Sequence, residues 1–537
     1  MLQTPVKDRT QTSEKGQEKS EEMNPRRKVC ALFLTVMAVL LVAGGVILPH
    51  FQGNPSPISR TSSTSFLPAP QLPSGPGVPV AVNMGMPRAP RSIASLQAPL
   101  TAPHMRQFTL VAQNTIISLG SGMRIPVWTF NGITPGPTLR VQQGDLVVVK
   151  VVNHLSFGIT IHWHGIDSFN SADGVAGTTQ DAIKAGQTYI YRFFTPDAGT
   201  YWYHSHQLSY DETVGGLFGI LIVDPQTPTI HADVDYAVAL HEWNGLDGQS
   251  VFAIDDASQT LNKVAKAGQW VRLRIVETSN TDSSIPHLVT LVGAPFEVIS
   301  LDGHDLNGPH MLNTVPIPIG TAQRVDLLFQ MPALGSVSLI TANEHDNNQH
   351  YQRFPALVIG QGSVPSTLPA VTKWFDLTTY GQPAPSPITP RSHFDTTYTI
   401  DLNNQMGTSL GRQGMTFTMN GKVFPYTGMI MVKYGQLVEI QLVNQSDLYH
   451  PIHLHGHIFT VLEKNGKPLT GSPVRLDTIL VQPHTTYDIA FVANNPGIWM
   501  IHCHNFLHAN WGMDMMLAYD GYSTPYTTGT QSGNFPD

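Results

Sequence analysis

The strongest constraint on the fold of this chain is an internal repeat, in which two distant segments share one strand pattern and one histidine position. Gly144–Asn153 and Gly435–Asn444 are both strand-like runs that begin at a glycine and end at an asparagine. A histidine follows each opening glycine after 18 positions, His162 in the first segment and His453 in the second. A shared register of this kind predicts that one structural unit occurs at least twice in the chain.

The repeat continues further along each segment and has a third, incomplete copy. Gly199–His206 aligns without a gap on Gly497–His504, and each stretch ends in a His-x-His pair. Ala267–Val276, between them, repeats the strand but contains no histidine pair. We therefore expect a body of three similar domains, of which the middle one is a spacer without metal ligands. The predicted domains are 105–225, 226–385 and 386–537.

The composition favours an all-β body. The chain has 46 glycines and 41 prolines among 537 residues, and they separate short β-branched runs such as Leu146–Val152. This turn-rich pattern is typical of β-sandwiches or barrels and does not suit a helical bundle. The net charge of -8 lacks the basic surplus that phosphate binding needs. Nucleic acid is therefore not an expected partner.

The first hundred residues predict a membrane anchor and a linker. Residues 1–28 are polar and form the expected cytoplasmic tail, and the 20 residues 29–48 carry no charge. At a rise of ~1.5 Å per residue, such a helix spans the ~30 Å hydrocarbon layer. The basic flank Arg26–Lys28 predicts a cytoplasmic N-terminus, which leaves the body anchored outside the cytoplasm, at the cell surface or in the periplasm. A cleaved signal segment, which would make the protein secreted, remains open. Residues 49–104, rich in proline and serine, are expected to be an extended linker.

Four histidine motifs provide the candidate metal ligands. They are His162-Trp-His164, His204-Ser-His206, His450-Pro-Ile-His453-Leu-His455 and His502-Cys503-His504. In a strand, side chains at positions i and i+2 share a face, so each His-x-His pair places two imidazoles side by side. Single histidines are often structural, but four pairs in a shared register predict a metal cluster. Imidazole ligands suit copper, zinc, iron or nickel, so the pairs alone do not identify the metal.

Cys503 narrows the choice of metal. Because it lies between His502 and His504, its side chain is expected on the opposite face of the same strand. A thiolate with two histidines and a weak methionine ligand is the arrangement of a blue-copper electron-transfer site. The residues that supply such a set are His450, Cys503, His508 and Met513. Structural zinc is a poor alternative, because a closed zinc site needs four ligands and this region offers many more.

Together these motifs resemble the copper motifs of the three-domain multicopper oxidases, the laccase-like enzymes built from cupredoxin domains. The resemblance covers about residues 105–525 and implies three cupredoxin-like Greek-key β-sandwich or barrel domains with four copper ions. The implied ligands are His450, Cys503, His508 and Met513 for type 1 copper, His162 and His453 for type 2 copper, and His164, His204, His206, His455, His502 and His504 for the type 3 pair. Ser205 stands where the repeat places Cys503, so the first domain is expected to lack a type 1 site. His457 falls outside the pattern, and we interpret it as structural.

The resemblance also implies an activity, in which the type 1 copper takes single electrons from a small reductant and the trinuclear cluster reduces dioxygen to water. The implied reductant is a phenol, an aromatic amine or a metal ion. Electrons are expected to arrive at the solvent-side edges of His450 and His508. Met513 as axial ligand should lower the type 1 potential relative to a leucine or phenylalanine there, which predicts a low- to medium-potential oxidase.

Reduction of dioxygen to water consumes protons, so an acid is expected near the cluster. Asp173, nine residues after His164, matches the position of the acid that family members place near the type 2 copper. A simple Asp-Gly turn is the alternative interpretation. Many bacterial relatives carry a glutamate directly after the second type 1 histidine, but Ala509 stands there in this chain. Asp211 and Glu212 are the candidates for this second proton donor.

Two other functions remain open. The first is a metal-ion oxidase acting on Cu(I), Mn(II) or Fe(II). A group of methionines could bind soft Cu(I), but we prefer to interpret them as hydrophobic strand residues. These methionines are Met406, Met415, Met419, Met429 and Met431. The second alternative is a copper-binding protein without turnover, which oxygen consumption with a phenolic donor would distinguish from an oxidase.

Overall fold

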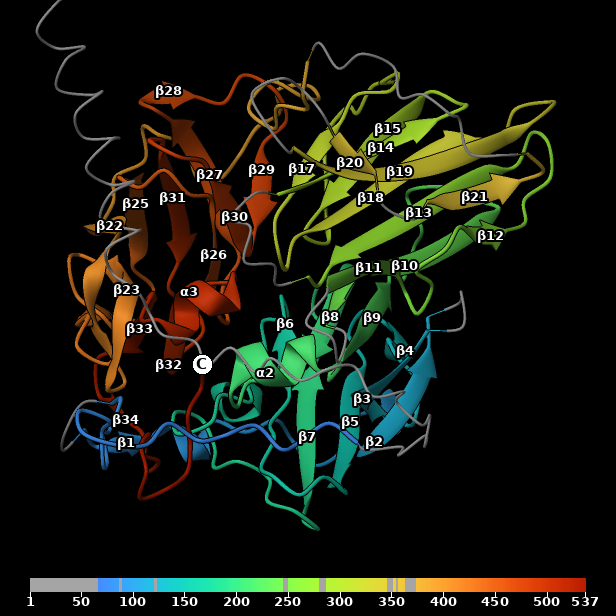
Figure 1. The fold of residues 1–537 in the computed structure, drawn as a ribbon. Coiled ribbons are helices and arrows are strands. Elements are labelled where there is room, and N and C mark those ends of the chain that lie inside the picture. Colours follow the sequence, from blue (N-terminus) through green and yellow to red (C-terminus); the bar gives the residue numbers. More distant parts are fainter. Residues whose placement is uncertain are drawn as a thin grey trace, which may run out of the picture. The chain divides into compact units, whose positions relative to one another are not determined.

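The computed structural model describes residues 66–85, 89–119, 123–244, 250–279, 286–344, 351–353, 356–362 and 373–537. This part of the chain is almost entirely β-structure and contains three pairs of sheets (Figure 1). Its two α-helices are the short segments α2 (Ser209–Val214) and α3 (Phe506–Asn510). The predicted transmembrane segment lies outside the described residues, among which no helix is long and apolar enough to cross a bilayer.

Each pair of sheets is built from the strands of one continuous segment. The first sandwich contains β2 (Met105–Ser118), β3 (Arg124–Phe130), β4 (Gly136–Gln142), β5 (Leu146–Asn153), β6 (His162–His164), β7 (Thr188–Phe194), β8 (Gly199–His204) and β9 (Phe218–Asp224). The middle sandwich contains β10 (Val234–Asn244), β11 (Ser250–Ile254), β12 (Leu261–Lys263), β13 (Trp270–Glu277), β14 (His287–Val292), β15 (Phe296–Leu301), β16 (His304–Asp305), β17 (Ile317–Ile319), β18 (Arg324–Gln330), β19 (Ser336–Glu344), β20 (Tyr351–Arg353) and β21 (Leu357–Gly360). The third sandwich contains β22 (Thr396–Ser409), β23 (Arg412–Met419), β24 (Met429–Val432), β25 (Leu437–Asn444), β26 (His450–Leu454), β27 (Phe459–Lys464), β28 (Lys467–Pro468), β29 (Val474–Leu476), β30 (Thr478–Val481), β31 (Thr486–Val492), β32 (Ile498–Cys503) and β33 (Asp514–Tyr519).

All three sandwiches share one strand order, which explains the sequence repeat. One sheet of each has the order β3-β2-β5-β7, β11-β10-β13-β18 or β23-β22-β25-β31, and in each the two inner strands are parallel. The three repeated sequence segments correspond to β5, β13 and β25. The second sheets of the first and third sandwiches also correspond, as β4-β9-β8-β6 and β24-β33-β32-β26. The predicted all-β body is therefore confirmed. Contacts between the sandwiches join Thr64–Asp537 into one compact unit, with no further division. The exact bounds of the three domains therefore stay a prediction.

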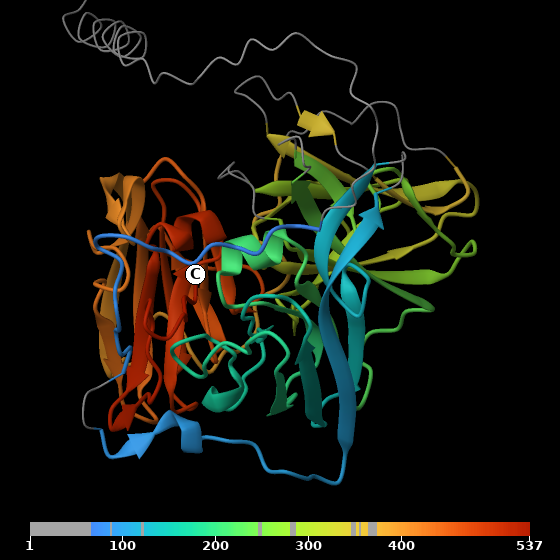
Figure 2. The ribbon, with the colours of Figure 1, turned by 60° about the horizontal axis from the view of Figure 1, so that its bottom comes forward.

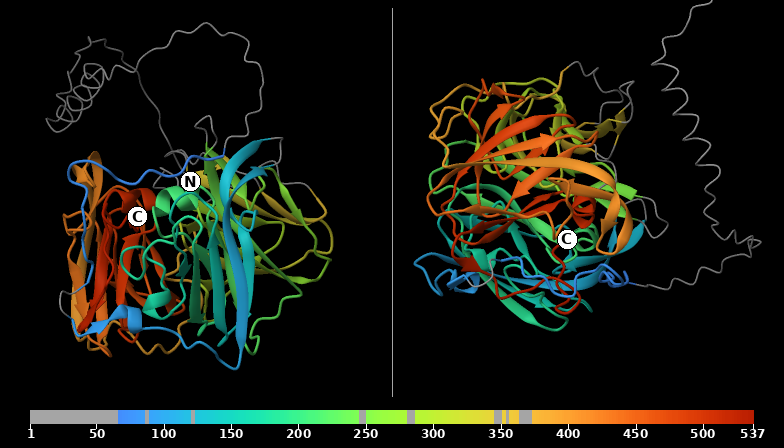
Figure 3. Two further views of the ribbon diagram at one scale, coloured as in Figure 1. Left: turned by 90° about the horizontal axis from the view of Figure 1, so that it is seen from below. Right: turned by 90° about the vertical axis from the view of Figure 1, so that its left-hand side faces the viewer.

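Of the predicted linker 49–104, the structure describes residues 66–85 and 89–104. These residues are largely extended, as expected, but they pair with the C-terminal part of the chain. Val82 and Thr528 exchange two backbone hydrogen bonds of 2.8 Å. β1 (Arg91–Ser92) pairs in parallel with β34 (Tyr522–Ser523) near the end of the chain. Figures 2 and 3 show this blue segment reaching the third sandwich before it returns to β2 in the first. Apolar side chains among its prolines are buried, and proline lowers the entropic cost of holding an extended chain.

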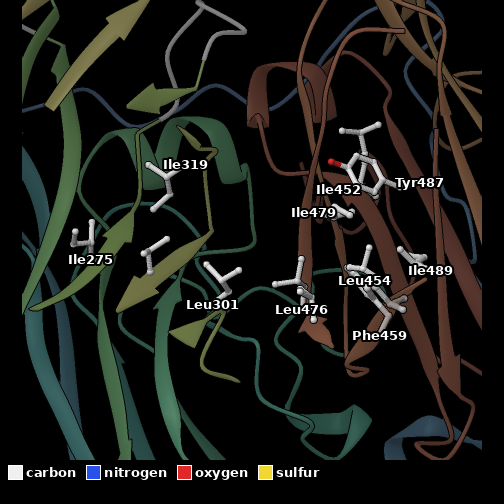
Figure 4. Packing of buried hydrophobic residues seen from close by; sticks show 14 of the residues in the cluster. Ile275, Leu301, Ile319, Ile452, Leu454, Phe459, Leu476, Ile479, Tyr487 and Ile489 are labelled. Atoms are coloured by element: carbon white, nitrogen blue, oxygen red, sulfur yellow. The ribbon is translucent and has the colours of Figure 1, made fainter. Parts of the chain in front are cut away.

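The middle and third sandwiches share one hydrophobic core. Leu301 and Ile319 of the middle sandwich face Leu476 and Ile479 of the third (Figure 4), and all four belong to one cluster of buried side chains. Burying side chains of this size contributes ~1.5–3 kcal/mol each, so this contact holds the two sandwiches together. Arg324, the first residue of β18, follows Ile319 after a short turn and is thereby brought next to the third sandwich.

Candidate metal centre

Two strand pairs, one from the first sandwich and one from the third, bring the four histidine motifs together. β6 pairs with β8 so that His162 lies opposite His204, and β26 pairs with β32 so that His453 lies opposite His502. The two strand pairs meet at the rings of His164 and His453, which stack with their centroids 3.7 Å apart. In Figure 1 this is where β6 and β8 of the first sandwich approach β26 and β32 of the third.

The eight histidines form groups whose ring nitrogens lie close enough to share a metal. Within each group the ligand atoms lie within 4.8 Å of one another. The groups are His164, His204 and His504; His206, His455 and His502; and His162, His164 and His453. The first two groups contain the six residues that the family resemblance assigns to the type 3 pair, and the third contains the two assigned to type 2. The structure thus brings together every histidine that was predicted for the cluster.

Seven buried ring nitrogens of these histidines have no hydrogen-bond partner within the described residues. They are His162 Nε2, His164 Nδ1, His204 Nε2, His206 Nε2, His453 Nε2 and both ring nitrogens of His504. Burial lowers the pKa of His164, His204, His206 and His504 well below the ordinary histidine value. Such rings are neutral, and a neutral imidazole nitrogen is a good copper ligand. Because buried polar atoms without partners are rare, this donor set fits copper.

Backbone carbonyls hold the opposite ring nitrogens of the cluster. They join Nδ1 of His162 to Asp173 (2.8 Å), of His204 to Ser205 (2.9 Å), of His206 to Pro536 (3.0 Å), of His453 to Asp477 (2.8 Å) and of His502 to Cys503 (3.2 Å). A carbonyl can only accept, so in each ring Nδ1 carries the proton and Nε2 keeps its lone pair. His164 is reversed, because its Nε2 lies 2.9 Å from Asp477 Oδ1 and leaves Nδ1 for a metal.

Cys503 on β32, His450 on β26 and His508 on α3 form a second, smaller site. The Sγ of Cys503 is 3.7 Å from His450 Nδ1 and 3.6 Å from His508 Nδ1, and these two nitrogens are 3.1 Å apart. Met513 is buried, and its backbone hydrogen-bonds to both Cys503 and His508. One sulfur and two imidazole nitrogens at the corners of a small triangle fit a single copper ion. The residues on either side of Cys503 belong to the histidine cluster, so one strand serves both sites.

The structure corrects one expectation about the smaller site, because neither of its histidines presents an edge to solvent. His450 is 0% exposed and His508 is 1% exposed. The ring of Phe417 is stacked on His508, and Ser446 Oγ lies 2.9 Å from His450 Nε2. Phe417 on β23 and the turn that carries Ser446 therefore separate both rings from a reductant in solution.

Asp173 lies between two histidines of the cluster. Both of its carboxylate oxygens are 3.1 Å from His455 Nδ1, and its Oδ1 is 3.2 Å from His162 Nδ1. The alternative Asp-Gly turn is also present, since Gly174 has a φ of +81° and a Cβ there would lie 1.8 Å from the carbonyl oxygen of Ile161. Asp173 is therefore both part of an Asp-Gly turn and an acid beside the cluster, because the turn places its carboxylate against the histidines.

The two sequence candidates for a second acid lie in different environments. Asp211 is exposed, whereas Glu212 is fully buried on the same helix, α2. Glu212 accepts a hydrogen bond from Ser205, the residue that replaces the cysteine in the first sandwich. Burial raises the pKa of Glu212 well above its ordinary value. The Ser205–Glu212 pair thus occupies the position that corresponds to the cysteine site of the third sandwich.

Beside Ala509 the structure reveals two acids that the sequence did not predict. Asp514 and Asp537 line the same small cavity as Ala509. Burial raises the pKa of Asp537 to about 8. Pro536, next to Asp537, supplies the carbonyl that holds His206. The C-terminal segment carries no local motif, so only its packing in the fold reveals its contact with the cluster.

Asp477 is a further residue of the cluster that no motif signalled. It follows β29 and contacts both His164 and His453, and it pairs with Arg324 of the middle sandwich. Spacing along the chain cannot reveal this contact, because three sandwiches contribute to it. His457, by contrast, lies outside the histidine groups, with its Nε2 2.6 Å from Tyr519 Oη.

Comparisons with known proteins agree with this geometry. Models of the multicopper oxidase family match residues 111–228 and 392–521. The chain is 30% identical over 481 residues to Laccase-1 of Botryotinia fuckeliana, an alignment that covers 79% of this chain and 83% of that protein. It is 28% identical over 467 residues to multicopper oxidase MmcO of Mycobacterium tuberculosis, with coverages of 76% and 86%. The crystal structure of a multi-copper oxidase from Pseudomonas thermotolerans matches with a TM-score of 0.62 at 28% identity, covering 78% of this chain and 100% of that one.

Proposed function

Because this chain belongs to the multicopper oxidase family, we propose that its eight cluster histidines hold three copper ions and that the Cys503 site holds a fourth. The chain is a copper-dependent oxidoreductase that uses dioxygen as its electron acceptor. We assign type 1 copper to the Cys503 site, type 2 copper to His162 and His453, and the type 3 pair to the remaining six histidines. Met513 is the proposed axial ligand of type 1 copper.

One observation supports this assignment above all: Cys503 and its two flanking histidines lie on a single strand but belong to different sites. Bound copper would supply one-electron oxidation at the single site and four-electron reduction of dioxygen to water at the cluster. Cys503 links the two, since only a few covalent bonds separate its Sγ from the rings of the flanking histidines. Asp173, between His162 and His455, is positioned to hold and deliver a proton.

The proposed reductants are phenols and similar small aromatic donors. A cavity of about 330 Å³ lies between the middle and third sandwiches, within the size range of small-ligand pockets. Trp374, Phe375 and Tyr487 contribute aromatic surface to it. Leu480 also lines it, and Leu480 belongs to β30, the strand that pairs with β26 next to His450. A donor bound there can pass electrons to the buried ring through paired strands rather than by direct contact.

The test of this function is oxygen uptake by the copper-loaded protein with 2,6-dimethoxyphenol as donor. We expect a strong blue absorption and steady oxygen consumption with water as the product. Cys503→Ser should abolish both the blue colour and the phenol-driven uptake, whereas Ser205→Ala, at the corresponding position of the repeat, should keep the colour. Copper binding without oxygen uptake would favour the non-catalytic alternative, and full activity in Cys503→Ser would exclude the proposed electron route.

Oxidation of Cu(I) is a second candidate, supported by one pair of methionines. Met406 and Met415 lie opposite each other on β22 and β23 and are 76% and 44% exposed. Met419 is fully buried, and the two methionines of β24 are half-buried, as expected for hydrophobic strand residues. Among these five methionines, only Met406 and Met415 therefore offer exposed thioethers to a soft ion. Steady-state rates with Cu(I), Mn(II), Fe(II) and the phenol, measured on one preparation, rank the candidates.

We also propose that residues 29–48 anchor the protein in a membrane with its catalytic body outside the cytoplasm. The uncharged run and its basic N-terminal flank support this orientation. Fractionation of cells that express the full chain is the test. Recovery of the body with the membrane, accessible to protease only from outside, is expected. A soluble protein that has lost residues 1–48 would instead indicate a cleaved signal segment.

A further inference from the structure

Arg324 carries a positive charge to the histidine cluster from the sandwich that has no metal ligands. It is the first residue of β18, and its side chain is fully buried. All five of its N–H groups donate hydrogen bonds. Nε donates to the carbonyl of Thr200 (3.0 Å), Nη1 to the carbonyl of Ala322 (3.1 Å) and to Asp477 Oδ1 (2.8 Å), and Nη2 to the carbonyl of Asp302 (3.0 Å) and to Asp477 Oδ2. A buried guanidinium with every donor occupied has one orientation available.

Asp477 transmits this orientation to two histidines. Its Oδ1 accepts a hydrogen bond from His164 Nε2 at 2.9 Å, and its backbone carbonyl accepts one from His453 Nδ1 at 2.8 Å. The hydroxyl of Thr478 lies 3.1 Å from His164 Nε2 and 3.2 Å from His453 Nδ1, and 2.8 Å from Asp477 Oδ1. The Asp477 carboxylate and the Thr478 hydroxyl therefore orient the ring of His164, which leaves its Nδ1 for a metal. They also support the ring of His453, which leaves its Nε2 for a metal.

The chain after His164 is shaped around the same ion pair. Gly165 has a φ of +85°, and a Cβ at this position would lie 2.6 Å from Arg324 Nη2 and 2.6 Å from Asp477 Oδ2. Any side chain here would collide with both partners of the pair. The glycine that follows the His-Trp-His motif thus makes room for an arginine that comes from a different sandwich.

We propose that Arg324 is a positioning residue for the copper cluster, and that it holds Asp477 so that His164 presents Nδ1 and His453 presents Nε2 to the metal. This inference rests on the proposed function, because it requires copper at these histidines. The middle sandwich then does more than separate the other two, since it supplies the residue that orients ligands of both type 2 and type 3 copper.

A purely structural ion pair makes a different prediction. If Arg324 only stabilised the interface between sandwiches, its loss would weaken all copper sites together with the fold. A positioning role predicts a selective effect, in which type 2 and type 3 copper change while type 1 copper, whose ligands do not touch Asp477, stays intact. Residues that orient metal-bound histidines typically change metal affinity by about 10–100-fold.

The experiment compares Arg324→Lys with the parent in the copper-loaded full chain. Lysine keeps the charge but cannot make the paired bonds to Asp477. We expect about 10–100-fold weaker retention of cluster copper against a chelator, an altered type 2 electron paramagnetic resonance spectrum and a weaker near-ultraviolet absorption of the type 3 pair. The blue band should remain and reports folding in the same sample. Arg272→Lys is the matched control, because Arg272 lies in the same sheet and pairs with Asp326 through two nitrogens.

A second variant, Asp477→Asn, tests whether Arg324 acts through Asp477. A protein that carries both Arg324→Lys and Asp477→Asn should retain copper as well as Asp477→Asn alone, because both changes break the same Arg324–Asp477 pair. Additive losses, or copper retention and spectra in Arg324→Lys that match the parent, would overturn the inference. Loss of the blue band in step with the cluster signals would also overturn it in favour of a structural role. A parent protein without any copper signals would count against the proposed function itself, so the two failures are distinguishable.

Discussion

The ring of Phe417 lies flat against the ring of His508, with their centroids 3.9 Å apart and their planes inclined by 22°. His450, the other histidine of the Cys503 site, is closed off by the hydroxyl of Ser446. A reductant therefore touches neither histidine of the proposed type 1 site directly: Phe417 covers the ring of His508, and paired strands lie between His450 and the proposed donor cavity. Electron transfer has to cross this layer, which adds distance and slows the step in comparison with direct contact to an exposed imidazole.

Phe417→Ala should make the protein a faster oxidase of phenols. The change removes the ring that covers His508 and opens a second, more direct approach to that ring, apart from the proposed donor cavity, which Phe417 does not line. We therefore expect kcat/KM for 2,6-dimethoxyphenol to rise while the KM for dioxygen stays unchanged. Removing a buried phenylalanine also costs about 3–5 kcal/mol of stability. Phe329→Ala, a buried phenylalanine of the middle sandwich, which has no proposed copper ligands, controls for this loss. A decrease in kcat/KM with an intact blue band would show that Phe417 conducts electrons rather than shielding the ring.

Met513→Leu should raise the potential of the type 1 copper. Met513 is fully buried, and its backbone hydrogen-bonds to Cys503 and His508, which places it beside the metal ligands. A thioether ligand lowers the potential, and leucine cannot coordinate. Redox titration of the blue band in the parent and in the variant measures the change. An unchanged potential would mean that the sulfur of Met513 is not bound.

The repeat and the histidine motifs predicted most of the site, because the ligands lie within short stretches of sequence at fixed spacings. Strand alternation alone separates Cys503 from its flanking histidines, and the structure places them in two different sites. Arg324 and the C-terminal Pro536 could not be predicted in this way. Arg324 reaches the cluster through Asp477, and Pro536 contacts His206, only because separate segments pack together; neither has a spacing that relates it to a histidine. The buried state of His508 was also beyond the sequence, since it depends on how β23 packs over α3.

Asp173→Asn should slow turnover without bleaching the blue band. Asparagine keeps the shape of the turn, and the backbone carbonyl that holds His162 is unaffected, but the amide cannot hold and deliver a proton. General acid catalysis contributes about 100-fold or more to rates, so we expect a comparable loss in kcat with little change in the KM for the phenol. Stopped-flow reduction of type 1 copper should stay fast. A bleached type 1 site would instead show that Asp173 is structural.

His241 should make the stability of the protein depend on pH in a defined window. The ring is fully buried on β10, where its Nδ1 lies 3.1 Å from the carbonyl of Thr278 and its Nε2 lies 3.4 Å from the carbonyl of Val214 at the end of α2. Burial lowers the pKa of His241 from 6.5 to about 4. Between these values the unfolded chain binds a proton that the folded protein does not, so stability is complete above pH 6.5 and falls as the pH approaches 4.

His241→Gln removes this titration and isolates its effect. Above pH 6.5 the variant should be less stable than the parent by about 1–2 kcal/mol, because it loses part of the hydrogen bonding. As the pH falls below 6.5 the difference should shrink, at a rate of up to about 1.4 kcal/mol per pH unit, and it should reverse in sign before pH 4, since only the parent is then destabilised by protonation of the unfolded chain. Calorimetric unfolding of the copper-loaded proteins at a series of pH values measures it. His231→Gln, at an exposed position, is the matched control for the histidine-to-glutamine change itself. A difference that stays constant across the window would mean that the His241 ring is already protonated, or equally accessible, in the folded state.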